Sequence, residues 1–183
     1  PTITTLEGAF DGLEYDKEEV DMLTTKWKET AYYKQTCVLM PRNPERVITG
    51  TDYHPKGWHF NLKIASEFQP SPTITAMGAT EKTAGVCHWN DDRKFTLGEL
   101  KRVTSLPDDF ILTGKWAQKS ERCGRMVPSL MMKALASSMY EKVIKNIDHE
   151  GIKSKEQYEN TFSISNENED VTLYNCYGNC IIV

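Results

Sequence analysis

Residues 93–136 constrain the fold of this chain most, because they carry two helix signals in succession. Thr96 and Glu99 form a T-x-x-E capping box, in which each side chain bonds a backbone N–H at the start of a helix. The sequence predicts a helix from Thr96 that Pro107 ends, since the residue before a proline avoids the helical region. Three apolar residues share one face of this helix: Leu97, Leu100 and Val103.

A longer helix is predicted from Pro128, which is pre-set for a first turn, to residue 147. Gly124 precedes it and permits a tight backbone path. Between the two helices, Asp108 and Asp109 predict a turn, followed by a short apolar run that Gly114 closes. Apolar residues recur at helical spacing along the longer helix: Met132, Leu135, Met139, Val143 and Ile147.

The N-terminal segments predict elements that pack against this region. Residues 1–13 indicate an extended lead-in and a turn, and Asp16 with Glu19 indicates the start of a helix to about Lys28. Residues 32–33 and 37–40 have the composition of strands. Residues 51–92 mix aromatic residues, histidines, glycines and prolines without helical periodicity, so we expect loops and short strands that carry recognition residues.

Charge is divided unevenly along the chain, whose formal net charge is −4. Residues 1–30 have 3 basic and 8 acidic side chains, residues 146–183 have 2 and 7, and residues 93–133 have 9 and 4. A basic segment is what contact with phosphate requires. Such segregation is also common in proteins that never bind nucleic acid.

Composition excludes several classes of protein. With 39% hydrophobic and 26% charged residues and no apolar run of membrane-spanning length, the chain is typical of a globular protein without a membrane partner. Its five cysteines include no C-x-x-C pair, which argues against a disulfide framework and favours a reducing cytoplasm. His54, His59 and His88 lack the spacing of metal ligands, so we predict no metal site.

The two helix signals also carry sequence motifs. The patterns R-x-F-T-x-x-E-x-x-R-x-x-S-x-P-D-D-F and Q-x-x-x-x-x-G-x-x-V-P resemble the last two motifs of DNA cytosine-5 methyltransferases. Thr104, Leu106 and Arg125 depart from the residues usual in that family, which are glutamine, phenylalanine and asparagine. The matching positions are Arg93, Thr96, Glu99, Arg102, Pro107, Asp108, Asp109, Gln118, Gly124, Val127 and Pro128.

The resemblance implies that the first motif positions a target-recognition domain and that the second closes over the methyl donor S-adenosylmethionine. Cofactor contacts are then implied at Gly124, Arg125, Met126 and Val127, with only a backbone contact at Arg125. Two weaker patterns, YHPKG from residue 53 and PSPTIT from residue 70, are similar to target-recognition sequences of the same family. Lysine, histidine and threonine there can reach phosphates or base edges, or they can be turn residues and a strand start. We predict DNA contacts at His54, Lys56, Trp58, Thr73, Thr75, Arg93 and Arg102.

Catalytic chemistry of the family is missing from this chain. The family needs a cysteine nucleophile in a Pro-Cys dipeptide, a Glu-Asn-Val segment and a glycine-rich cofactor loop. None of the five cysteines of this chain follows a proline. Cys123 lies beside the second motif, but we interpret it as a small buried residue. We therefore expect no catalytic residue in this chain, which corresponds to the C-terminal part of the enzyme and should not methylate by itself.

The predicted fold class is α+β: a small β-rich recognition domain with peripheral helices, plus a long C-terminal helix that packs on an α/β catalytic domain absent from this chain. The predicted divisions are a lead-in and packing helix (1–50), the target-recognition domain (51–127), the returning helix (128–147) and an acidic tail (148–183). The expected partners are duplex DNA, the missing N-terminal catalytic half and a second copy of the isolated chain.

We expect a cytoplasmic restriction–modification enzyme of bacterial or phage origin, which methylates cytosine C5 after rotating the base out of the duplex. Two alternatives stay open. The chain could be the small subunit of a split methyltransferase, or a DNA-binding or interaction module without catalysis. The coding sequence upstream of Pro1 would separate these three interpretations.

Overall fold

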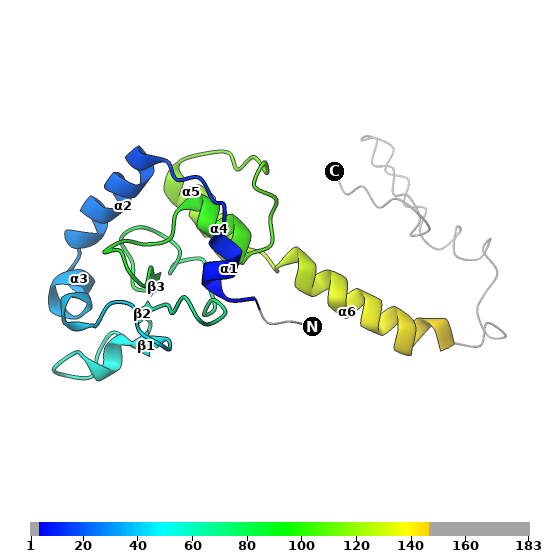
Figure 1. Cartoon of the computed structure of the whole chain (residues 1–183), viewed down its shortest axis with the longest axis horizontal. Coiled ribbons are helices and arrows are strands. Elements are labelled where there is room, and N and C mark those ends of the chain that lie inside the picture. Colours follow the sequence, from blue (N-terminus) through cyan, green and yellow to red (C-terminus); the bar gives the residue numbers. More distant parts are fainter. Residues whose placement is uncertain (1–3, 147–183) are drawn as a thin grey trace, which may run out of the picture. The chain divides into compact units, whose positions relative to one another are not determined.

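The computed structural model describes residues 4–146, and the chain divides after Ala136, within its last long helix, into two units. Figure 1 shows the elements in chain order. They are α1 (Leu6–Phe10), α2 (Lys17–Lys28), α3 (Ala31–Gln35), η1 (Cys37–Leu39), β1 (Ile48–Thr49), η2 (Gly50–Asp52), β2 (Lys63–Ile64), β3 (Val86–Cys87), α4 (Leu97–Val103), α5 (Trp116–Arg125), α6 (Ser129–Lys142) and η3 (Ile144–Asn146).

A three-stranded sheet, in the order β1-β2-β3, lies in the first unit. β1 pairs antiparallel with β2, where Ile48 faces Ile64, and β2 pairs parallel with β3, where Ile64 faces Cys87. Each strand has 2 residues, so most of residues 51–92 is loop and turn, as predicted. The mixed helix-and-sheet class is confirmed, but the sheet is smaller than a β-rich domain would have.

The helix α1 replaces the extended lead-in predicted for residues 1–13. Thr5 is its N-cap, and the Thr5 hydroxyl accepts a hydrogen bond from the Gly8 N–H at 3.2 Å. Leu6 and Phe10 are four residues apart, lie on one side of the helix and are buried. The prediction was wrong because one helical turn is too short to show a period, and tertiary burial stabilises it instead.

The helix α2 confirms the prediction from Asp16 to Lys28. Asp16 caps it by accepting a hydrogen bond from the Glu18 N–H at 2.9 Å. Leu23 and Trp27 of its apolar face are 0% exposed. α2 is therefore a packing helix of the core.

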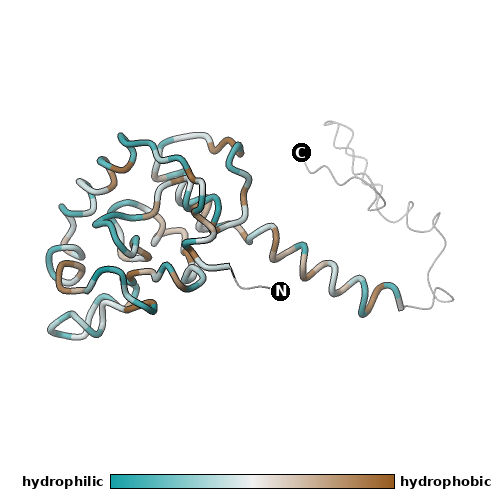
Figure 2. Tube along the Cα trace, viewed as in Figure 1, coloured by the Kyte–Doolittle hydropathy of each residue, from teal (hydrophilic) through white to brown (hydrophobic). Residues whose placement is uncertain are grey.

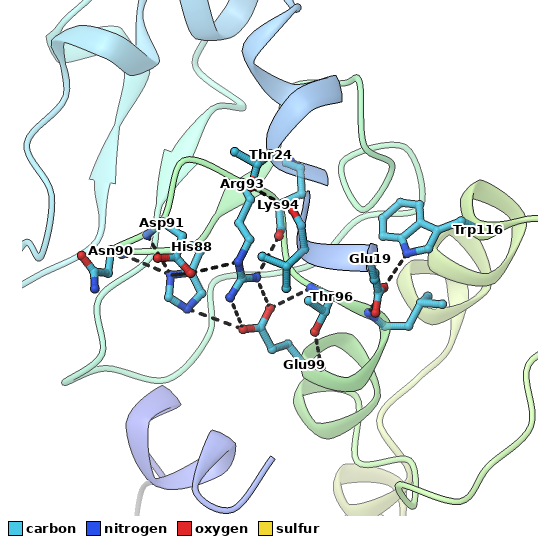
Figure 3. Close-up of polar contacts among 12 residues, drawn as sticks. Glu19, Thr24, His88, Asn90, Asp91, Arg93, Lys94, Thr96, Glu99 and Trp116 are labelled. Atoms are coloured by element: carbon cyan, nitrogen blue, oxygen red, sulfur yellow. Dashed lines mark hydrogen bonds and ion pairs between the residues drawn. The ribbon is translucent and has the colours of Figure 1, made fainter. Parts of the chain in front are cut away.

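Glu19, which with Asp16 indicated the start of this helix, bonds other elements instead. Its Oε1 accepts one hydrogen bond from the Leu97 N–H at 2.8 Å and another from Trp116 Nε1 at 2.6 Å (Figure 3). Leu97 begins α4 and Trp116 begins α5. One carboxylate of α2 therefore holds the starts of both helices, and we call this arrangement the Glu19 clamp.

The segments predicted as strands in residues 32–40 are the helices α3 and η1. Thr30 caps α3, because its hydroxyl accepts the Tyr33 N–H at 3.1 Å and donates to the Trp27 carbonyl at 2.8 Å. The strand preference of tyrosine and valine is weak and depends on context, so this local cap and the adjoining core override it.

The hydrophobic core joins α1, α2, the sheet and α4. Phe10 stacks on Trp89 with 5.6 Å between ring centroids and meets Phe95 edge-on at 5.6 Å. Both geometries are favourable for aromatic pairs. The fully buried apolar side chains also include Leu62 and Ile64.

The helix α4 begins as predicted, since Thr96 and Glu99 make both hydrogen bonds of the capping box. It ends at Val103, before the predicted stop. Ser105 has φ 62°, and the N–H groups of Ser105 and the next residue bond carbonyls of the last turn. A left-handed Ser105, rather than Pro107, therefore ends the helix.

The helix α5 was not predicted, and it contains most of the second motif. Gly124 lies in its last turn instead of in a tight loop. A Cβ at Gly124 would lie 2.6 Å from the carbonyl carbon and oxygen of Thr75. Glycine is needed here for close approach of a helix to a backbone, rather than for an unusual φ.

The helix α6 confirms the predicted position but ends at Lys142, while Ile147 and the tail 148–183 lie outside the described residues. Apolar residues recur along its length (Figure 2). They surround the helix instead of forming the single stripe predicted, and they are exposed: Leu130, Met131, Met132, Leu135, Met139 and Tyr140. Within residues 4–146, no helix has the length and apolar character needed to cross a bilayer.

Candidate functional site

Three of the predicted DNA contacts meet in residues 54–60, which we call the 54–60 loop. His54 Nδ1 accepts hydrogen bonds from the backbone N–H groups of Lys56 at 3.1 Å and Trp58 at 3.4 Å. The His54 and Trp58 rings stack at 5.4 Å with an interplanar angle of 13°. Lys56 Nζ lies 5.2 Å from the centroid of the same indole ring. His54 therefore braces a loop that carries an ammonium group and an exposed indole.

His59 attaches this loop to residues of α3 and the segment that follows it. It has φ 64°, and its Nδ1 is hydrogen-bonded to Thr36 Oγ1 at 2.7 Å. The Tyr32 ring meets the imidazole edge-on at 4.9 Å. Burial, and then the charge of His54, lower the pKa of His59 from its ordinary value. His59 is therefore neutral at neutral pH.

Thr73 and Thr75 are exposed, in the loop that follows β2. Thr75 Oγ1 accepts a hydrogen bond from the Gly78 N–H at 3.1 Å, which closes a local turn. The Thr75 backbone is also the surface against which Gly124 packs. The segment predicted to contact DNA therefore touches Gly124, one of the residues predicted to contact the cofactor.

Arg93, one of the residues predicted to contact DNA, is buried in the first unit. The residue is 2% exposed, and its Nη1 and Nη2 donate to the two carboxylate oxygens of Glu99 at 2.7 and 2.9 Å (Figure 3). Its Nε donates to Asp91 Oδ2 at 3.0 Å. Glu99 is itself 0% exposed, so each side chain neutralises the buried charge of the other. Arg93 holds the capping box of α4 to the preceding loop.

His88 joins the same network next to β3. Its Nε2 lies 3.5 Å from Glu99 Oε1, and its Nδ1 accepts the N–H groups of Asn90 and Asp91 at 3.2 and 3.1 Å. Burial above all, and then the Arg93 charge, lower the pKa of His88 to about 4. As pH falls, the His88 imidazole therefore takes up a proton in the unfolded chain before it does so in the folded chain. The free energy of unfolding should decrease for this reason between about pH 6.5 and about pH 4.

Arg102, also predicted to contact DNA, makes hydrogen bonds inside the first unit. Its Nε and Nη2 donate to the Asp108 carboxylate at 3.0 and 2.7 Å. Its Nη1 donates to the carbonyls of Ala9 at 3.1 Å and Asp11 at 2.6 Å. Arg102 therefore ties α4 to the end of α1 and to the loop after Pro107.

Burial changes what the basic excess of residues 93–133 means. Arg93 and Lys94 are 2% and 1% exposed, and Lys94 Nζ lies 5.2 Å from the centroid of the Trp27 ring. Arg102 is hydrogen-bonded to three residues of the first unit, as described above. The positive surface of this segment is therefore smaller than its count of basic residues indicates.

The residues predicted to contact the cofactor lie at the end of α5 and in the link to α6. Arg125 is exposed and pairs with Glu121 at 2.6 Å. The Met126 N–H donates to the Arg122 carbonyl at 3.2 Å, and Val127 is 52% exposed. This strip is partly apolar and partly exposed, so a ligand can reach it, and its contact with the cofactor stays a prediction.

A groove of about 560 Å³ lies between residues 12–14, α4 and the loop 108–112. Glu19, Lys101 and Lys119 are among the residues that line it, and Lys101 Nζ bonds the carbonyls of Asp108 and, at 3.3 Å, Phe110. The sequence motifs include Arg102 and Asp108, but they do not show that a groove forms here, because its walls come from segments far apart in the chain.

Two curated relatives match parts of the chain. The Type II methyltransferase M1.HphI of Haemophilus parahaemolyticus is 32% identical over 68 residues, which cover 37% of this chain and 18% of the relative. The Type II methyltransferase M.SacI of Streptomyces achromogenes is 28% identical over 95 residues, which cover 47% and 24%. The matched region thus spans less than a quarter of the length of each relative. No solved structure matches the chain.

The model of the C-5 cytosine-specific DNA methylase family matches residues 4–141. This range takes in α1 to α5 and nearly all of α6, and it contains both motifs that carried the resemblance. The chain therefore belongs to the C-5 cytosine-specific DNA methylase family.

Proposed function

We propose that this chain is the C-terminal, DNA-recognition portion of a DNA cytosine-5 methyltransferase, which transfers a methyl group from S-adenosylmethionine to C5 of cytosine in duplex DNA. The observation that carries the proposal is a family match over residues 4–141 in a chain whose cysteines never follow a proline. The short share of each relative that the chain covers leaves ample length for catalytic motifs elsewhere in the whole protein.

The proposal gives separate roles to the segments described above. Lys56 contacts a phosphate, and the rest of the 54–60 loop lies against base edges, with Thr73 and Thr75 near the DNA backbone. Residues 124–127 form one wall of the cofactor pocket, mainly through backbone and the Val127 side chain. S-adenosylmethionine supplies the methyl group when it is bound there. The chain itself binds and orients, and contributes no nucleophile.

An assay of methyl transfer tests whether this chain binds without catalysing the reaction. The purified chain should transfer no labelled methyl group to DNA, because it lacks the thiolate that attacks the cytosine ring. Adding the N-terminal part of the protein should restore transfer, as measured by incorporation of label from S-adenosylmethionine. Turnover by residues 1–183 alone would contradict the proposal, and failure of the recombined parts would favour a module without catalysis.

Duplex binding by the chain should be weak and depend strongly on salt, because lysine contacts with phosphate release counterions. We expect Lys56→Ala to reduce the slope of log K against log salt by about 1. Fluorescence anisotropy of labelled duplex DNA over a salt series measures this slope. The control is Lys17→Ala, an exposed lysine in the acidic N-terminal segment, which should leave the slope unchanged. Equal affinity at low and moderate salt would argue against phosphate contact.

The exposed apolar side chains of α6 need a covering surface. Leu135 and Met139 are 49% and 58% exposed, and burying such a side chain contributes roughly 1.5–3 kcal/mol. In the proposed enzyme the catalytic part covers this helix. Without that part, the isolated chain should self-associate through α6, most simply as a two-fold dimer.

Replacing both Leu135 and Met139 by lysine should convert that dimer to a monomer, because two charges cannot be buried unpaired in the interface. Light scattering or sedimentation measures the change. A control with Ser137→Lys and Ser138→Lys adds the same charge to the same helix without removing apolar surface, so we expect it to perturb the dimer less. A monomeric wild-type chain would show that α6 does not mediate self-association.

A further inference from the structure

The 54–60 loop exposes two large aromatic side chains that contact with phosphate does not explain. Trp58 is 57% exposed and Phe60 is 70% exposed. The base of the loop is closed, because β1 pairs with β2 and the Gly50 N–H donates to the Leu62 carbonyl at 2.7 Å. Both rings are therefore carried on a short excursion between two paired strands.

Contacts within the loop fix its conformation. His54 fixes the backbone at two N–H groups and stacks on the indole of Trp58, as described above. Gly57 and His59 have φ 66° and 64°, so the chain turns sharply on both sides of Trp58. A loop that is already ordered loses little conformational entropy on binding, and Trp and Phe side chains have few rotatable bonds.

We propose that the 54–60 loop binds an unpaired base in DNA, with Trp58 and Phe60 as the stacking surface and Lys56 on the flanking phosphate. This inference rests on the proposed function and deepens it. Every base has a π-face that can stack on an aromatic ring, whereas a base inside an intact duplex already has both faces covered. The chain should therefore prefer DNA with an unpaired base, and His54 is the positioning residue of this site.

The test uses the full chain and two DNA probes of the same sequence, one fully paired and one with a single unpaired 2-aminopurine. We expect about 10-fold tighter binding to the unpaired probe, together with quenching of 2-aminopurine fluorescence. Trp58→Leu and Phe60→Leu should each remove most of the preference and the quenching, because leucine has no ring on which a base can stack, and should weaken binding to the paired probe less than binding to the unpaired probe. Trp58→Phe should keep both signals, because it keeps an aromatic ring.

His54→Ala separates positioning from stacking. It should weaken the preference for the unpaired probe, while quenching at saturating protein is retained, because the rings that stack are still present. Loss of quenching at saturation would instead make His54 part of the stacking surface and would overturn its assigned role.

Phe68→Leu is the matched control, since Phe68 is 56% exposed and lies outside the loop. It should change neither signal, and circular dichroism should show that each variant is folded. Equal binding of both probes by the wild type, or equal weakening of both by Trp58→Leu, would overturn this inference while leaving salt-dependent duplex binding intact. A chain that binds neither probe would overturn the proposed function as well.

Discussion

Glu99→Ala should lower the free energy of unfolding of the first unit by about 3–5 kcal/mol, because it leaves the Arg93 guanidinium buried without its carboxylate partner. Glu99 is 0% exposed and accepts from two Arg93 nitrogens and from the Thr96 N–H at 2.7 Å. The substitution removes the ion pair and half of the capping box together. Urea unfolding followed by circular dichroism measures the loss as a lower midpoint at unchanged slope.

Two further variants show whether burial is the cause. Glu121→Ala removes a solvent-exposed i,i+4 pair with Arg125 and should cost only about 0–1 kcal/mol. Combining Glu99→Leu with Arg93→Met should recover much of the lost stability, because no uncompensated charge then stays buried. If Glu99→Ala cost no more than Glu121→Ala, the buried pair would not be important for folding.

Gly124→Ala should destabilise the first unit by about 1–3 kcal/mol through overpacking, although alanine favours a helix interior by about 1 kcal/mol over glycine. The steric effect wins because the added Cβ would lie 2.6 Å from the Thr75 carbonyl and 2.7 Å from Ala76 Cα, which are backbone atoms. The end of α5 must therefore move away from residues 75–76. In the reconstituted enzyme this shift should also lower methyl transfer.

Gly98→Ala is the matched control for helix propensity. Gly98 lies in α4, and its Cβ would meet only the flexible end of Leu13, at 3.1 Å. This variant should be neutral or more stable than wild type by up to about 1 kcal/mol. In thermal or urea unfolding, the midpoint should thus fall for Gly124→Ala and stay the same or rise for Gly98→Ala. A Gly124→Ala variant as stable as Gly98→Ala would mean that α5 does not press on residues 75–76.

Local signals in the sequence predicted the helix starts that depend on one side chain. Asp16 and Thr96 each bond a backbone N–H two or three residues away, so the relevant atoms are neighbours in the chain. Pro128 likewise precedes α6 by one residue. The family resemblance was visible for the same reason, because both motifs are short and contiguous.

Features that depend on tertiary packing were not predictable in this way. Arg93 matches the motif, but the sequence does not show that Glu99 folds back over it and buries both side chains. The helix α5 was missed because its glycine indicated a turn, whereas that glycine is required by a backbone loop about 50 residues earlier in the chain. The sequence shows how many basic side chains the segment 93–133 has, but not which of them are exposed. Arg93 and Arg102 are bonded inside the fold, and that depends on tertiary structure.

The Glu19 clamp bears on how the chain folds during synthesis. Its two hydrogen bonds join residues separated by 78 and 97 positions in the sequence. Neither bond can form until Leu97 and Trp116 have left the ribosome, and long-range contacts of this kind slow folding because a large loop must close first. We therefore expect the N-terminal helices to wait, incompletely packed, until the two motif helices emerge, so the first unit completes its fold only after most of it has been translated.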